Sequence, residues 1–180
     1  MIDLTEIEKK LMEKESALDK LLVKARETVR ECSNAIKAIH SRDLRTARAH
    51  LKEAEKGVQV LTKMKSEFPA QVGHVLQEYA EAQITLEAIE RKRIPHYKEL
   101  GVEEVPYILG LLDAIGELKR EMYESLRRGE RKEAERYFSL MEEIYDTLLP
   151  LRFSNAVLPD FRRKQDAARM QIEQARGELL

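Results

Sequence analysis

The sequence has few of the residues that cross-link or interrupt a chain. Among 180 residues it has one cysteine, no tryptophan, seven glycines and five prolines, and aromatic residues make up only 6%. Cys32 therefore has no disulfide partner within the chain, and nothing indicates an oxidising compartment. No apolar run approaches the ~20 residues of a membrane-spanning helix, and the acidic N-terminal segment lacks the apolar stretch of a signal peptide. These absences predict a cytoplasmic protein that does not contact a membrane.

Charged residues are abundant instead, at 36% of the sequence beside 43% hydrophobic residues. The charged fraction lies above the roughly 25% of ordinary soluble domains, while the apolar fraction is too high for a disordered chain. Both values fit long amphipathic helices whose outer faces carry the charge. No segment shows the period-two alternation of a strand.

Apolar residues recur at helical spacing along most of the chain, and glycine and proline mark the breaks. We expect helices over residues 4–40, 44–65, 70–93, about 106–128 and 131–149, and from Pro159 to the C-terminus. The sequence thus predicts one all-α domain over residues 1–180, a bundle of six to seven helices. The first helix would exceed 30 residues, which is more than a compact monomer of this size covers, so oligomerisation through helical faces is expected.

The net charge of −1 hides an uneven distribution along the chain. Residues 20–65 carry twelve Lys or Arg against five Asp or Glu, whereas residues 99–146 carry seven against thirteen. In the basic part, Arg26, Arg30 and Lys37 share a helix face, and His40 lies one turn beyond Lys37. Such a stripe can neutralise the phosphates of a nucleic acid, although an ordinary solvated helix face is the alternative interpretation.

Two pairs of carboxylates stand at helical spacing. Glu78 and Glu81 share one face of the third long helix, and Asp113 and Glu117 share one face of the next. Asp113 is the only charged residue between Val105 and Gly116, where an unpaired acid costs free energy. If the two faces pack together, four carboxylates converge, and such hard oxygen ligands suit Mg²⁺ or Mn²⁺. The set contains no histidine, which argues against zinc.

Simpler interpretations of these residues stay open. Asp113 can instead be paired with a buried Arg or Lys. The Glu-x-x-Glu spacing alone is weak, since Glu121 and Glu124 repeat it, and we expect that pair on a solvated face. Gly110, close to Asp113 around the helix axis, permits close approach by another helix or by a ligand. His74 lies one turn before Glu78 and can hydrogen-bond it, touch a phosphate or be an ordinary surface or core histidine.

Residues 76–82 (LQEYAEA) and 107–118 (YILGLLDAIGEL) resemble the translin family, and more narrowly its translin-associated protein X branch. Residues 24–30, 68–70 and 158–164 agree more weakly, so the resemblance follows the whole chain in order. It implies an all-α fold of about seven helices that assembles into closed octameric shells binding RNA or single-stranded DNA. It also implies a metal-dependent endoribonuclease whose acids correspond to Glu78, Glu81, Asp113 and Glu117.

We therefore expect a Mg²⁺- or Mn²⁺-dependent endoribonuclease acting on single-stranded or short RNA inside a homo-octamer. Four acids would be both catalytic residues and metal ligands: Glu78, Glu81, Asp113 and Glu117. Five basic residues would contact the nucleic acid: Arg26, Arg30, Lys37, His40 and His74. The alternatives are a translin-like shell that binds RNA or single-stranded DNA without cleaving it, and a helical scaffold whose function is its oligomer faces.

Overall fold

The computed structural model describes residues 2–90 and 93–180, and seven α-helices form most of this part of the chain. They are α1 (Thr5–His40), α2 (Leu44–Thr62), α3 (Pro69–Glu90), α4 (Tyr97–Leu100), α5 (Glu104–Arg127), α6 (Arg131–Leu148) and α7 (Phe161–Leu179). Residues 2–90 and 93–180 contain no strand, and none of their helices combines the length and hydropathy needed to cross a bilayer. The prediction of an all-α fold is confirmed.

The helix bounds follow the predicted breaks within a few residues, with two differences. The second helix ends at Thr62 rather than at residue 65, and turns connect it to Phe68. The predicted end of the third helix includes Arg91 and Lys92, which lie outside the described residues. The short helix α4 was not predicted, because four residues are too few for a periodic pattern. A capping box forms it: the Glu99 side chain accepts from the backbone N–H of His96 at 2.9 Å.

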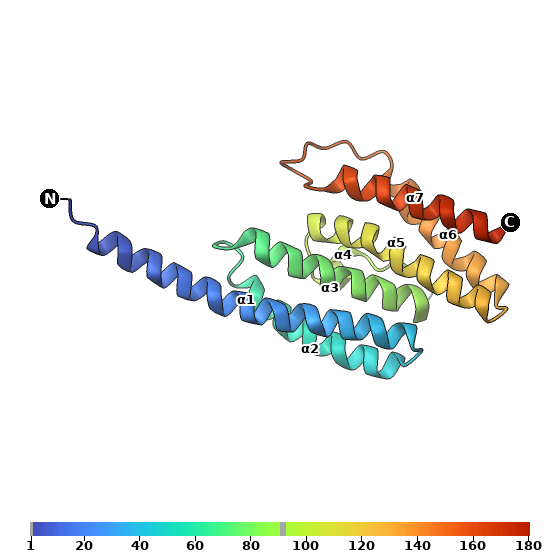
Figure 1. Ribbon diagram of the computed structural model, residues 1–180, viewed down its shortest axis with the longest axis horizontal. Helices are drawn as coiled ribbons and strands as arrows, with labels where there is room; N and C mark the ends of the chain where they lie inside the picture. The colour runs from blue at the N-terminus through green and yellow to red at the C-terminus, as the bar shows by residue number, and fades with distance from the viewer. Residues whose placement is uncertain (1, 91–92) are drawn as a thin grey trace.

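The helices form three layers (Figure 1). An antiparallel pair of α1 and α2 covers one side of α3, α3 packs against α5 in the middle, and α6 and α7 cover the other side of α5. The core therefore consists of the faces of α3 and α5 together with the inner faces of their neighbours. This layering places α3 and α5, which carry the candidate acids, in the centre of the bundle.

The two halves of α1 differ in their packing. Ala35 and Ile39 of the second half are fully buried. The first half projects beyond the bundle (Figure 1), and its apolar residues Leu11 and Met12 are 61% and 65% exposed. The sequence predicted such an uncovered helical surface, because the first helix is longer than a compact monomer can cover. The oligomer that would cover it stays a prediction.

Gly110 sets the distance between α3 and α5. A Cβ atom at Gly110 would lie 2.9 Å from the Cβ of Ala80 and 3.1 Å from the backbone nitrogen of Glu81. The first distance is shorter than real Cβ contacts and the second is tighter than most of them, so glycine lets the helices cross here in close backbone contact. The sequence allowed either another helix or a ligand to approach Gly110 closely, and in the structure helix α3 does so. Because Asp113 lies one turn after Gly110, the crossing brings Asp113 close to Glu81.

Candidate functional site

The crossing of α3 and α5 gathers the four predicted acids, Glu78, Glu81, Asp113 and Glu117, into one cluster, hereafter the acidic cluster. The pKa of Glu81 is raised to about 8, chiefly by burial and then, in that order, by the negative charges of Asp113, Glu78 and Glu117. The pKa of Glu78 is also raised, chiefly by burial, with His74 opposing the shift and Asp113 adding to it. Glu81 therefore feels the charges of the other three acids, two of them across the interface of the two helices.

One cation enters the acidic cluster from a distant part of the chain. The ammonium of Lys164, near the start of α7, lies 2.5 Å from Oδ1 of Asp113, and the amide of Gln77 donates to Oδ2 at 2.6 Å. The positive charge of Lys164 also lowers the pKa values of Glu78 and Glu81, but less than burial raises them. In the structure Asp113 is thus paired with a basic residue, as the alternative interpretation of the sequence expected.

Glu117 is held from the other side by His40. The His40 side chain is 4% exposed, and its Nε2 lies 2.5 Å from Oε2 of Glu117. Its Nδ1 lies 2.6 Å from Oε1 of Glu121. Burial opposes the charge on the ring, but the hydrogen bonds to Glu117 and Glu121 outweigh it, so the pKa of His40 is raised.

These contacts change two sequence-based expectations. Glu121 was expected on a solvated face with Glu124, and that expectation is wrong, because Glu121 is fully buried. His40 was expected to contact nucleic acid together with Lys37. The structure instead turns the His40 ring into the interface with α5, because His40 is the last residue of α1 and its side chain faces α5 rather than solvent.

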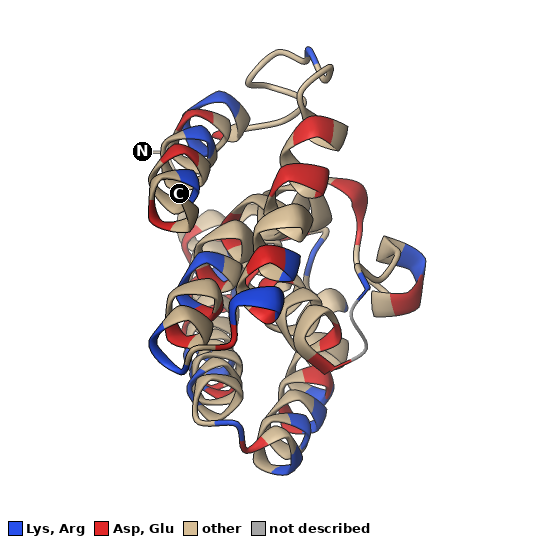
Figure 2. Cartoon of the chain, turned by 90° about the vertical axis from the view of Figure 1, so that its right-hand side faces the viewer, with Lys and Arg blue, Asp and Glu red and all other residues tan. Residues whose placement is uncertain are grey.

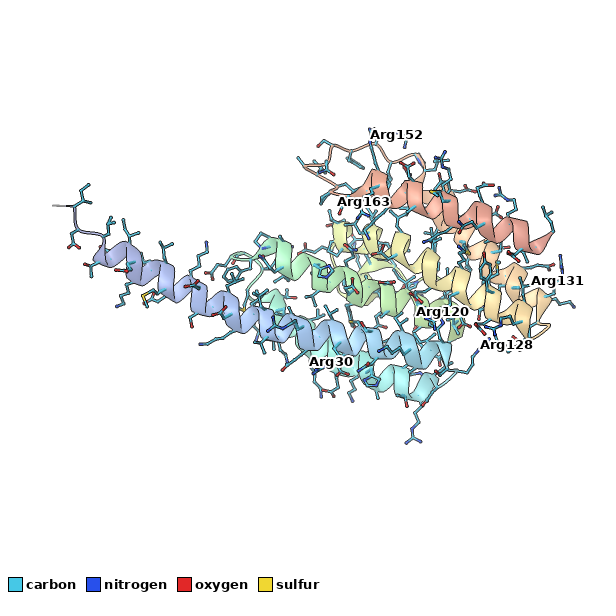
Figure 3. The ribbon with its side chains drawn as sticks, viewed as in Figure 1. Arg30, Arg120, Arg128, Arg131, Arg152 and Arg163 are labelled. Atoms are coloured by element: carbon cyan, nitrogen blue, oxygen red, sulfur yellow. The ribbon has the colours of Figure 1, made fainter. Side chains whose placement is uncertain are left out.

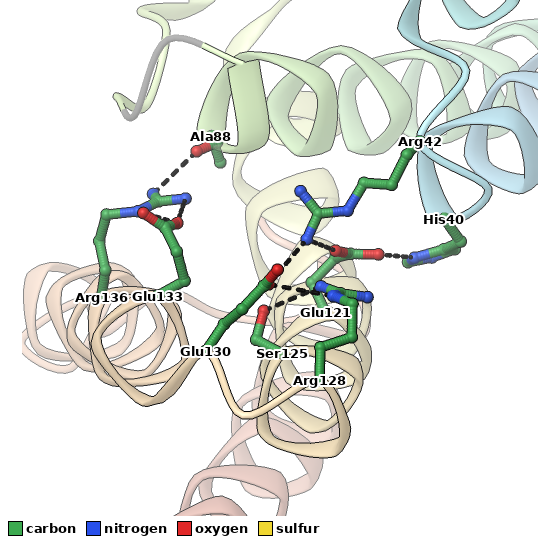
Figure 4. Close-up of polar contacts among 9 residues, drawn as sticks. All are labelled: His40, Arg42, Ala88, Glu121, Ser125, Arg128, Glu130, Glu133 and Arg136. Atoms are coloured by element: carbon green, nitrogen blue, oxygen red, sulfur yellow. Dashed lines mark hydrogen bonds and ion pairs between the residues drawn. The ribbon is translucent and has the colours of Figure 1, made fainter.

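A chain of polar contacts continues outward from Glu121 (Figure 4). The guanidinium of Arg42 lies 3.5 Å from Oε2 of Glu121 and 3.6 Å from Glu130, which also pairs with Arg128 at 3.0 Å. Arg42 has a φ of 61°, in the left-handed region that non-glycine residues seldom occupy. Glu121 is thus flanked by Arg42 and by His40, which it shares with Glu117 of the acidic cluster.

Three of the predicted basic residues stand together on the outer face of α1. Arg26, Arg30 and Lys37 are exposed and line a groove of about 490 Å³ between α1 and α3. Figure 3 shows Arg30 on α1 and Arg120 on α5. His74 lines the same groove from α3, and its Nε2 lies 4.0 Å from Oε1 of Glu78. His74 therefore connects the groove with the acidic cluster, whereas His40 does not line the groove.

The charge segregation along the sequence is partly compensated in space. Arg48 pairs with Glu90 and Lys65 with Glu103, so cations of the first helices meet acids of later ones. Both signs are interspersed on the end of the bundle that carries the α1–α2 and α5–α6 turns (Figure 2). Within the described residues no ion pair involves Arg26, Arg30 or Lys37, whose charges remain available to a ligand. We call the surface that Arg26, Arg30, Lys37 and His74 line the basic groove.

The buried Cys32 lies behind the acidic cluster and shows no activation. The pKa of its thiol is raised to about 12, chiefly by burial and then by the charges of Glu78 and Glu81. The thiol therefore stays protonated near neutral pH, and a nucleophilic role has no support.

The donor chemistry of the acidic cluster fits a hard divalent cation. Its carboxylate oxygens are the ligands that Mg²⁺ and Mn²⁺ prefer, and a dication would relieve the repulsion that raises the pKa of Glu81. Residues 2–90 and 93–180 hold no group of three or more His, Cys, Asp or Glu side chains already arranged around one point. Because Lys164 and Gln77 occupy both oxygens of Asp113, a cation would have to displace or share these contacts.

Comparison with known proteins adds relatives over nearly the whole chain. The model of the translin family matches residues 4–175. An uncharacterised protein of Methanocaldococcus jannaschii is 35% identical over 94% of this chain and 78% of its own. A structure of AfC3PO with duplex RNA superimposes with a TM-score of 0.89 at 30% identity, covering 99% of this chain and 95% of that one. A structure of apo-NeC3PO gives 0.88 at 23% identity, covering 99% and 96%, and shows the likeness of fold alone.

Proposed function

The chain belongs to the translin family, and we propose that it is a metal-dependent endoribonuclease that cleaves RNA at the acidic cluster. The observation that carries this proposal is the excess of negative charge where α3 crosses α5. Four carboxylates share this space, and the pKa of Glu81 reaches about 8 because of burial and of their mutual repulsion. Negative charge without enough compensating positive charge costs stability, and it is typical of sites that bind a cation or carry out proton chemistry.

Glu78, Glu81, Asp113 and Glu117 would hold Mg²⁺ or Mn²⁺. When bound, such an ion polarises the attacking water and neutralises charge on the scissile phosphate. The chain's own residues hold the substrate: Arg26, Arg30 and Lys37 bind the sugar–phosphate backbone in the basic groove. His74, between the groove and Glu78, would place the backbone beside the carboxylates.

RNA as the ligand is supported by two observations. AfC3PO, which shares 30% identity over almost the whole chain, has been solved with duplex RNA. In addition, Arg26, Arg30 and Lys37 stay exposed without ion pairs among the described residues, as phosphate-binding residues should. We further propose that the substrate is single-stranded or short RNA and that the exposed first half of α1 helps to build a homo-octamer.

The test is a cleavage assay on end-labelled RNA, single-stranded and duplex, with Mg²⁺ or Mn²⁺ and with excess chelator. We expect cleavage to leave a 5′-phosphate and a 3′-hydroxyl and to stop in chelator. Asp113→Asn should lower the rate at least about 100-fold, because a charged group at the reacting centre is lost. Asp166→Asn, on the exposed face of α7, is the matched control and should change little. Unchanged cleavage in chelator or in Asp113→Asn would contradict the proposal.

The second candidate is an RNA-binding protein of the same fold that does not cleave. It is favoured by the contacts of Asp113, whose two oxygens are already bound by Lys164 and Gln77. This candidate predicts salt-sensitive RNA binding through the basic groove and intact RNA with every divalent ion. The same assay therefore separates the two candidates.

A further inference from the structure

Glu121 is a fully buried carboxylate that the proposed function does not use. It lies one turn after Glu117 on α5, and its side chain has no measurable exposure. A buried carboxylate is kept in a protein only where other groups compensate its charge. The groups that contact Glu121 therefore indicate which part of the molecule this carboxylate holds in place.

The His40 ring lies between Glu121 and Glu117. Carboxylate oxygens lie 2.6 Å from Nδ1 and 2.5 Å from Nε2, so each ring nitrogen has its own carboxylate. A neutral imidazole has only one N–H, whereas an imidazolium donates from both nitrogens. The two contacts are therefore those of an imidazolium between two carboxylates, which are short and directional hydrogen bonds.

The element that carries His40 is itself fixed. His40 ends α1, and the following Arg42 and Asp43 form the turn to α2. Arg42 pairs with Glu121 and Glu130, and the Asp43 side chain caps α2 by accepting from the backbone N–H of Thr46 at 3.0 Å. The ring is thus anchored by its own backbone and by Glu121 on the side away from the acidic cluster.

We propose that His40 and Glu121 are positioning residues for Glu117. Glu121 fixes the ring of His40, and the ring fixes Oε2 of Glu117, so that the remaining oxygen of Glu117 is directed toward the acidic cluster. The proposal rests on the proposed function, because it assigns Glu117 a divalent cation to bind. Groups that orient a metal ligand typically change metal affinity 10- to 100-fold when they are removed.

The experiment compares His40→Ala and His40→Gln with the unmodified protein by calorimetric titration of Mn²⁺, without RNA and well below the unfolding transition. Both variants remove the same charge beside Glu117, but only the glutamine keeps a donor that can reach it. On charge alone both should bind Mn²⁺ more tightly. We expect His40→Ala to bind Mn²⁺ about tenfold more weakly and His40→Gln to recover part of that loss.

Glu121→Gln is the second variant, because it keeps the shape of the buried side chain. It should also weaken Mn²⁺ binding, while Glu124→Gln, the same change on a half-exposed residue of α5, should not. If His40→Ala does not fold, Glu121→Gln and its control decide.

The outcomes separate this proposal from the proposed function. Mn²⁺ affinity that is unchanged or higher in His40→Ala, or unchanged in a folded Glu121→Gln, would overturn the positioning role even if the protein cleaves RNA. Mn²⁺ binding that follows the expected order in a protein that leaves RNA intact would support the positioning role and contradict the nuclease. A protein that binds no Mn²⁺ would overturn both.

Discussion

Helix α5 carries acids in two settings that differ in charge balance, half-buried at Asp113 and Glu117 and fully buried at Glu121. Toward its start, Asp113 and Glu117 face Glu78 and Glu81 of α3, and the single lysine there leaves the pKa of Glu81 at about 8. One turn further, Glu121 is more deeply buried but meets both His40 and Arg42. The balanced group stabilises the fold by itself, whereas the acidic cluster holds a proton on Glu81 near neutral pH, which an added cation would replace. The difference separates architecture from candidate function along one helix.

The largest expected effect follows from breaking the balanced group. Glu121→Ala should lower the free energy of unfolding by about 3 kcal/mol, because it leaves His40 and Arg42 without their buried partner. Glu81→Ala removes a carboxylate that its neighbours repel, so at pH 8 its effect should be smaller than about 1 kcal/mol. Urea denaturation of both variants measures the contrast, and equal losses would show that the two groups do not differ as described.

The pH dependence of stability sharpens the same comparison. Glu81 keeps its proton in the folded state up to a pKa of about 8, whereas its unfolded-state pKa is near 4.5, so its contribution to stability falls as the pH rises between these values. The raised pKa of His40 acts in the same direction: its contribution is complete below the ordinary pKa of 6.5 and is lost as the pH rises through the folded value.

We therefore expect unfolding free energies to decline from pH 5 to pH 9, with Glu81 accounting for a change on the order of 4 kcal/mol. Glu81→Gln should flatten that part of the profile, and Mn²⁺ at pH 8 should restore stability in the unmodified protein, because it replaces the proton. His40→Gln removes the titration of the histidine, so comparing its profile with that of the unmodified protein gives the share of the decline that is due to His40. A profile that is the same in Glu81→Gln would show that Glu81 is not perturbed in solution.

The sequence predicted those features that follow from the spacing of residues within one helix. Apolar periodicity located the six long helices, and the i, i+4 spacing of Asp113 and Glu117 in an apolar run, together with the family resemblance, selected the acids that the structure gathers. The His40–Glu121 contact joins residues 81 apart, and Lys164 reaches Asp113 from 51 residues away. No spacing rule connects such pairs, because their proximity arises only when the bundle brings the end of α1 to α5 and packs α7 on α5.

The smallest expected effect concerns Lys164, the cation that contacts Asp113 in the acidic cluster. Lys164→Met keeps the apolar stem of the side chain but removes the ammonium from Asp113, so one oxygen of Asp113 becomes free and the cluster more negative. We expect Mn²⁺ to bind a few-fold more tightly, about three- to tenfold, since at an effective dielectric of about 20 a nearby unit charge contributes on this scale after relaxation. Arg163→Met is the matched control, because Arg163 precedes Lys164 in α7 but pairs with Asp160 at the surface. If Mn²⁺ affinity stays the same while RNA binding weakens in Lys164→Met alone, the ammonium serves the phosphate and does not compete with the metal. The acidic cluster would then be more nearly balanced than its contacts indicate, and the contrast with Glu121 would narrow.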